Sequence, residues 1–129
     1  MQNHFRYLLP ICYMAALFYV SSMPGHIMEA DPAFGLLTPN LQNLLHVPVY
    51  GGLALSWWWA LETHVTAKKS RLITAFTLTV MYGIVDESWQ LYIPGRYGSL
   101  TDLALNALGA AIALWVVARH SAHPSQNLK

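Results

Sequence analysis

The sequence predicts an all-α membrane protein, with four transmembrane helices packed in a compact bundle. Three observations support this prediction. The 129 residues are 55% hydrophobic and only 10% charged, with a mean hydropathy of +0.36, whereas soluble domains are about one-quarter charged. Four apolar runs are long enough to cross a bilayer. Proline, glycine or clusters of polar residues separate these runs, which is typical of helix ends.

The length and composition indicate one domain and exclude one class of partner. No internal repeat, low-complexity tract or linker divides the chain, so residues 1–129 are treated as a single transmembrane domain. A formal net charge of +1 gives no basis for nucleic-acid binding. The one cysteine, Cys12, cannot form an internal disulfide.

The first apolar run covers about residues 5–23 and is followed by Pro24 and Gly25, which stop a helix. A cleaved signal peptide is the alternative interpretation, because Arg6 can serve as its basic end and two serines as its small residues. The run is rich in aromatic residues and lacks a clear A-x-A cleavage site, which favours a transmembrane helix.

The second apolar run covers about residues 44–61 and carries His46 in its first turn. Three consecutive tryptophans, residues 57–59, lie near its far end, and such clusters favour the membrane–water interface. A short polar loop, residues 62–71, follows. These features place the far end of the second helix at one membrane surface.

The third and fourth runs cover about residues 72–91 and 100–118, and a turn at Pro94 and Gly95 folds the fourth back against the third. Asp102 lies in the first turn of the fourth helix, where the helix dipole favours a negative charge. The last residues, 119–129, form a polar tail.

Basic residues fall on one side of this predicted topology. With four spans, both termini lie on the same side of the membrane. That side holds all but one of the seven lysines and arginines, namely Arg6, Lys68, Lys69, Arg71, Arg119 and Lys129. Because cytoplasmic loops are enriched in lysine and arginine, both termini and the tail are predicted to be cytoplasmic. Arg96 is the one basic residue on the outer side.

Polar residues from three different runs fall in one layer near the outer side. His46 lies near the outer end of the second span, and Asp102 and Asn106 lie in the first turns of the fourth. Asp86 lies about 9 Å inside the outer end of the third span, at 1.5 Å per residue. Ionisable side chains at such depth are costly, so they face the bundle interior or a wet cavity. The sequence therefore predicts a polar site that opens to the outer leaflet.

Two carboxylates in this layer are candidates for catalysis. Asp86 and Glu87 are neighbours in a poorly solvated place, which disfavours double ionisation and suits general acid–base chemistry. Adjacent residues of a helix diverge by about 100°, so Asp86, which shares a face with Gln90, is expected to point inward. His46 is the natural partner of this carboxylate, and Arg96 can bind the phosphate of a lipid headgroup. The other candidates for substrate binding share the polar layer: Gln90, Asp102, Asn106 and Tyr50.

A structural role is the alternative interpretation of the same residues. Gln90 can bond to Asp86 across one helical turn, and Glu87 can pair with Arg96. Polar contacts of this kind hold membrane helices together. On this interpretation the layer is a lock between helices, and no chemistry follows from it.

A metal site is a further option that the sequence does not establish. Two ligands can be drawn from His46, Asp86 and Asp102, which converge from three helices. No HExxH or comparable metal-ligand spacing occurs in the chain. The sequence therefore assigns no metal ion, and it identifies no cofactor.

The residues of this layer also resemble a known family. The spacing Asp86-Glu87-x-x-Gln90-x-x-x-Pro94-Gly95-Arg96, followed by Asp102, Asn106 and Gly109, is similar to the pattern of the VanZ-like family. So are His46-x-x-x-Tyr50 and Tyr19-Val20-Ser21-Ser22, and the resemblance covers about residues 7 to 115. Members often have Asp-Lys before the helix that bears the histidine, where this chain has Gln42 and Asn43.

The resemblance implies a small polytopic protein of the bacterial cytoplasmic membrane. The family is named for a protein linked to resistance to the glycopeptide teicoplanin. One expectation is a membrane-embedded enzyme that acts on a lipid-linked or cell-envelope substrate. The other is a non-catalytic protein that binds envelope lipids or glycopeptides. A transporter is a weaker interpretation, since the four spans show no internal repeat and no pair of broken helices. Membrane lipids are expected partners, and the oligomeric state is open.

Overall fold

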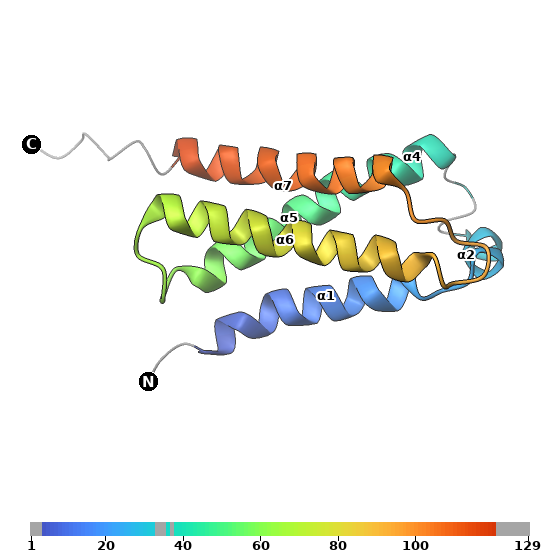
Figure 1. The fold of residues 1–129 in the computed structure, drawn as a ribbon, viewed down its shortest axis with the longest axis horizontal. Helices are drawn as coiled ribbons and strands as arrows, with labels where there is room; N and C mark the ends of the chain where they lie inside the picture. Colours follow the sequence, from blue (N-terminus) through green and yellow to red (C-terminus); the bar gives the residue numbers. More distant parts are fainter. Residues whose placement is uncertain (1–3, 33–35, 37, 121–129) are drawn as a thin grey trace, which may run out of the picture.

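The structure is a computed structural model that describes residues 4–32, 36 and 38–120 (Figure 1). The regular elements that these residues form are all helices, with no β-strand among them, which confirms the all-α class. The helices in chain order are η1 (His4–Tyr7), α1 (Leu8–Ser21), α2 (Gly25–Ala30), α4 (Pro39–Leu44), α5 (His46–Leu61), α6 (Lys68–Gln90) and α7 (Leu100–His120).

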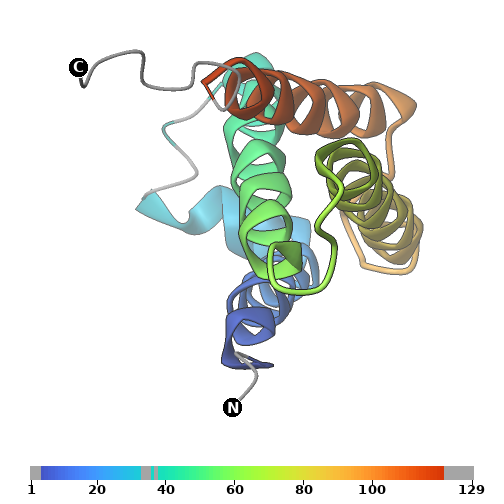
Figure 2. The same ribbon diagram turned by 90° about the vertical axis from the view of Figure 1, so that its left-hand side faces the viewer.

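The four long helices α1, α5, α6 and α7 run back and forth along the long axis of the molecule (Figure 1). Helix α5 crosses the bundle obliquely and packs against α1, α6 and α7, as the end view in Figure 2 shows. The short helices α2 and α4 lie at one end, together with the turn between α6 and α7. The beginning of α1 and the end of α7 lie at the opposite end.

Each long helix overlaps one predicted span, although the boundaries differ. Among the described residues, α7 is the one helix that is long and apolar enough to cross a membrane by length and composition. Helix α1 has 14 residues because a 3-10 turn precedes it, and α5 has 16 because Leu45 separates it from α4. Helix α6 has charged residues near both ends. A membrane crossing by all four helices therefore stays a prediction.

The turn after α6 is fixed against the beginning of α2. Gly95 adopts a left-handed backbone conformation with φ +73°, which glycine reaches without steric cost. The backbone N–H of Gly25 donates to the carbonyl oxygen of Pro94 at 3.1 Å. A Cβ atom on Gly25 would overlap the carbonyl group of Gly95. This close approach holds the α6–α7 turn over the polar end of the bundle.

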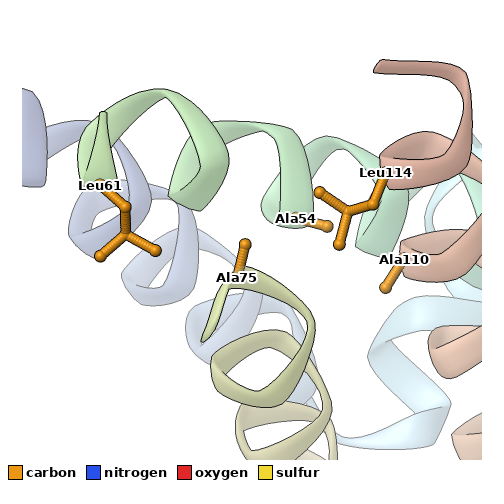
Figure 3. Packing of buried hydrophobic residues seen from close by; sticks show 5 residues of the cluster. All are labelled: Ala54, Leu61, Ala75, Ala110 and Leu114. Carbon is orange, nitrogen blue, oxygen red and sulfur yellow. The ribbon is translucent and has the colours of Figure 1, made fainter. Parts of the chain in front are cut away.

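The apolar interior combines alanines with a few leucines, and many large apolar residues face outward. Figure 3 shows the buried cluster at the junction of α5, α6 and α7, formed by Ala54, Leu61, Ala75, Ala110 and Leu114. The outward faces of α6 and α7 carry exposed Ile73, Met81, Ile84, Val85, Leu108, Ile112, Trp115 and Val116. Small residues at helix contacts let backbones approach closely, as they do in membrane bundles.

The end of the bundle opposite α2 and α4 gathers basic residues around Glu62. Nη1 of Arg6 lies 2.9 Å from Oε2 of Glu62, and Nη1 of Arg71 lies 3.4 Å from Oε1. Lys68 donates from Nζ to the carbonyl oxygen of Ala118 at 2.7 Å. The guanidinium of Arg71 stacks over Trp58 at 3.8 Å from the ring centre. Arg6, Lys68 and Arg71 thus share one end, as the predicted topology requires.

The structure tests only the beginning of the predicted polar tail, residues 119–129. Helix α7 continues to His120, two residues beyond the predicted span, and the guanidinium of Arg119 stacks over Trp115 at 4.8 Å within its last turns. Lys129 and the rest of the tail from residue 121 lie outside the described residues.

The ion pairs of Glu62 predict a small dependence of stability on pH. The hydrogen bond from Arg6, helped by the charge of Arg71, holds the pKa of the Glu62 carboxyl below its usual value. Ionised Glu62 therefore stabilises the folded protein above the pKa of the unfolded carboxyl, about 4.3. This contribution is lost as the pH falls through the lower folded value. Because Glu62 is half-exposed, we expect less than about 1 kcal/mol.

Thermal unfolding of the wild type and of Glu62→Gln in detergent, between about pH 3 and pH 7, measures this contribution. The wild type should have a slightly higher midpoint near neutral pH, and the two curves should meet in acid. A constant difference at every pH would show that the ion pairs with Arg6 and Arg71 are not its source.

Candidate functional site

The predicted polar residues do meet at one end of the bundle, beside α2 and α4. Tyr50, Asp86, Glu87, Gln90, Asp102 and Asn106 are all at most 9% exposed. His46 and Arg96 are half-buried beside them. The helical repeat explains this convergence, because each helix contributes residues four apart that share one face. His46 and Tyr50 on α5 illustrate it, since their rings stack with centres 6.1 Å apart and an angle of 15°.

Asp86 is the centre of one group of hydrogen bonds, which we call the Asp86 cluster (Ser21, Tyr50, Asp86 and Gln90). Its Oδ2 accepts from the Ser21 hydroxyl at 2.8 Å, from the Tyr50 hydroxyl at 3.1 Å and from Nε2 of Gln90 at 3.4 Å. The cluster therefore joins α1, α5 and α6 through one oxygen atom. The other oxygen, Oδ1, is buried and has no partner among the described residues.

Arg96 is attached to this cluster through Gln90. Its Nη2 donates to Oε1 of Gln90 at 3.1 Å, and its Nη1 contacts the sulfur of Met28 on α2. No ion pair joins Arg96 to Glu87, although both residues are described. The neutral amide of Gln90 therefore orients the guanidinium, and the carboxylate of Glu87 does not neutralise its charge.

Glu87 belongs to a second group, which we call the Glu87 cluster (His46, Glu87, Asp102 and Asn106). Its Oε2 accepts from the backbone N–H of Ser99 at 3.0 Å. Nδ1 of His46 donates to Oδ1 of Asn106 at 2.8 Å. One potential ligand atom from each of His46, Glu87 and Asp102 lies within 4.8 Å of the other two. These three residues could hold a metal ion.

Several buried atoms of the Glu87 cluster lack partners. Oε1 of Glu87, Oδ1 of Asp102 and Nδ2 of Asn106 make no hydrogen bond within the described part of the chain. Glu87 is 6% exposed and Asn106 is fully buried. Unpaired buried polar atoms, charged ones above all, cost free energy, so these atoms mark a place where a ligand or a proton is expected.

The structure changes two expected pairings. His46 was the predicted partner of Asp86, but it bonds to Asn106 and lies with Glu87 and Asp102 instead. The pair of Glu87 with Arg96 is replaced by bonds from Glu87 to Ser99 and from Arg96 to Gln90. The divergence of about 100° between adjacent helical residues sends the two carboxylates into different clusters, and both become buried.

Ser21 and Ser99 are site residues that sequence reasoning did not select. Ser21 is the last residue of α1, and two signals were available for it: this position before Pro24, and its place in the Tyr19-Val20-Ser21-Ser22 element of the family resemblance. Ser99 bonds to Glu87 through its backbone N–H, which no side-chain pattern reveals. The catalytic and binding roles of the predicted residues stay predictions.

A cavity of about 360 Å³ lies beside the Asp86 cluster and is also lined by His46 and Asp102 of the Glu87 cluster. Its polar lining includes His46, Tyr50, Asp86, Gln90, Arg96 and Asp102. Leu17, Val20 and Val49 supply an apolar wall. Gln42 and Asn43, where the family often has Asp-Lys, line it as well. The cavity thus offers carboxylates, amides, an imidazole and a guanidinium beside an apolar surface.

Comparison with known proteins identifies the family of this chain but no individual relative. Neither the curated proteins nor the solved structures gave a significant match. A sequence model of the family described as VanZ/LLP1 matches residues 5–120, which is most of the chain and includes every residue of both clusters. The chain therefore belongs to the VanZ/LLP1 family.

Proposed function

We propose that this chain is a multi-pass protein of the bacterial cytoplasmic membrane, with both termini in the cytoplasm. Family membership and the apolar helix α7 support a membrane location. The exposed apolar side chains of α6 and α7 and the inward carboxylates add to this, because ionisable residues within a bilayer face the bundle interior. The shared end of Arg6, Lys68 and Arg71 supports the orientation.

The function that the site supports best is that of a membrane-embedded enzyme acting on a lipid-linked or cell-envelope substrate. The cavity carries this proposal, because it places Asp86 and Arg96 on one surface beside an apolar wall. Its volume of about 360 Å³ falls within the range of about 300–1,000 Å³ typical of small-molecule sites. It suits a polar headgroup whose hydrocarbon part stays in the bilayer.

The geometry suggests how the residues divide the work. Arg96, positioned by Gln90, offers a guanidinium for a phosphate oxygen of the headgroup. Asp86, held through Oδ2 by Ser21 and Tyr50, has Oδ1 free to exchange a proton with the substrate. Glu87 and His46 lie together on the other side of the layer.

Replacement of Asp86 by asparagine tests this proposal. In Asp86→Asn the new amide keeps one acceptor oxygen for Ser21 or Tyr50, but it cannot take up or release a proton at this position. We expect nearly complete loss of the cellular effect, with little change in thermal stability in detergent. The readouts are teicoplanin tolerance and the envelope-lipid profile of cells that make each variant.

Glu29→Gln is the matched control, since Glu29 is an exposed carboxylate on α2 at the same end of the bundle. It should behave as the wild type. The enzyme proposal fails if Asp86→Asn and Glu87→Gln both keep full function.

A non-catalytic binding or glycopeptide-resistance protein is the second candidate. The guanidinium of Arg96 favours it, because it faces the cavity without an ion pair to the nearby Glu87. Such a protein would hold an envelope lipid or a glycopeptide without turning it over. Substitutions at Gln90, Arg96 and Asp86 should then weaken binding by graded amounts, whereas an enzyme should lose nearly all activity at Asp86 alone.

A further inference from the structure

We propose that His46, Glu87 and Asp102 form a binding site for one divalent transition-metal ion, with Zn²⁺ as the test metal. The proposal deepens the proposed function and rests on it for the use of the metal, although binding itself can be measured without any activity. Its basis is the approach of the three ligand atoms to within 4.8 Å of one another.

Burial makes a cation at this point favourable. Glu87 and Asp102 each keep one buried oxygen without a partner among the described residues, and they are only 6% and 9% exposed. Arg96 donates to Gln90 and not to Glu87. Two neighbouring buried carboxylates repel each other, and a divalent cation between them would remove this repulsion and satisfy both free oxygens.

Asn106 prepares His46 for this role. A metal-bound histidine usually donates its second ring N–H to a nearby acceptor, which fixes the tautomer and the ring orientation. Here Nδ1 of His46 donates to Oδ1 of Asn106 at 2.8 Å. Nε2 is therefore the ring nitrogen left with a free lone pair. The stacking of His46 on Tyr50 restrains the ring further.

The donor set selects the kind of ion. An imidazole suits Zn²⁺ and other transition metals, whereas Mg²⁺ and Ca²⁺ prefer oxygen ligands alone. Three protein ligands leave a fourth position for water or substrate, as in catalytic zinc sites. Zn²⁺ bonds of about 2.0–2.2 Å require ligand atoms about 3.3–3.5 Å apart, so binding would draw the three side chains slightly together. Asp86 is not a ligand, because it lies in the other cluster.

The test is zinc binding by the purified full-length protein in detergent. The protein is made with a tag that contains no histidine, treated with a chelator, and titrated with Zn²⁺ against a chromophoric competitor. We expect one Zn²⁺ per chain. Glu87→Gln and Asp102→Asn should each weaken binding by more than the roughly 10–100-fold that loss of an outer partner costs. Asn106→Ala should fall within that range.

Asp86→Asn is the matched control, because it makes the same carboxylate-to-amide change at the residue next to Glu87. It should keep its zinc. Co²⁺ gives a second readout, since its visible absorption should change in His46→Gln. Size-exclusion profiles and helical circular dichroism establish that each variant is folded.

Three outcomes would overturn the proposal. In the first outcome, the protein binds no zinc after loading. In the second, Glu87→Gln and Asp86→Asn lose zinc equally. In the third, equal concentrations of Mg²⁺ or Ca²⁺ displace Zn²⁺. The first would indicate that a proton shared by Glu87 and Asp102 fills the place of the ion. Failure of the proposed function is distinguishable, because it appears as full cellular function of both Asp86→Asn and Glu87→Gln, whether or not the wild type binds zinc.

Discussion

Gly109→Ala should strongly destabilise the protein, although alanine is the better helix former. A Cβ atom at position 109 would lie well inside van der Waals contact with the backbone carbonyl of Val47 on α5. Backbone atoms cannot rotate away as a side chain can, so α5 and α7 would have to separate. Overpacking of this kind costs about 1–3 kcal/mol or more, and the gain of about 1 kcal/mol in helix propensity offsets only part of it.

The same contact also affects the site. His46 precedes Val47 on α5, and Asn106 lies one turn before Gly109 on α7. Separation of the two helices at Gly109 should therefore lengthen the bond between His46 and Asn106. We expect Gly109→Ala to lower the thermal midpoint in detergent and to lower function with it.

Gly83→Ala is the control for Gly109→Ala. A Cβ atom on Gly83 would meet only side-chain atoms, of Asn106 and Tyr50, at 3.3 Å. These side chains would have to give by only a few tenths of an ångström, and side chains give more easily than backbone, so the loss of stability should be smaller than in Gly109→Ala. Equal midpoints for the two variants would show that close backbone packing does not fix the α5–α7 contact.

Asp86→Leu should lower stability by about 3 kcal/mol or more, because it leaves several buried donors without their acceptor. The leucine side chain branches at the same atom as aspartate but accepts no hydrogen bond. The hydroxyls of Ser21 and Tyr50 would be left buried without their acceptor, together with the amide of Gln90. Each such donor costs about 1–3 kcal/mol. Chemical or thermal unfolding in detergent measures the loss.

Two milder variants accompany Asp86→Leu. Asp86→Asn keeps an acceptor and should lose little stability, and Tyr50→Phe removes one donor and should lose about 1 kcal/mol. If Asp86→Leu is as stable as the wild type, the Asp86 cluster does not hold α1, α5 and α6 together. If Asp86→Asn is as unstable as Asp86→Leu, the carboxylate is a structural lock, and its catalytic role is wrong.

Composition and helical periodicity predict much of this protein. The low content of charged residues predicts the helical class, and the helix-breaking Pro24 and Pro94 help to predict the order of the long helices. Both properties can be read locally, because each depends on residues that are close together in the sequence. The positions of His46, Asp86 and Asn106 along three apolar runs also predict that polar groups converge in one layer. Helix pitch alone gives their depth, and the structure brings them to the same end of the bundle, with His46 and Asp86 on one cavity and Asn106 bonded to His46.

Partners within that layer depend on how the helices cross. The sequence suggested His46 as the partner of Asp86 and, in the structural alternative, Arg96 as the partner of Glu87. In the structure, packing of α5 on α7 brings His46 to Asn106 and close to Glu87. The rotation of each helix about its own axis decides which atoms touch. That rotation is set by close contacts such as Gly109 with Val47, which involve residues far apart in the sequence. The chain by itself therefore determines a helical protein with a polar layer, and only the tertiary structure divides that layer into the Asp86 and Glu87 clusters.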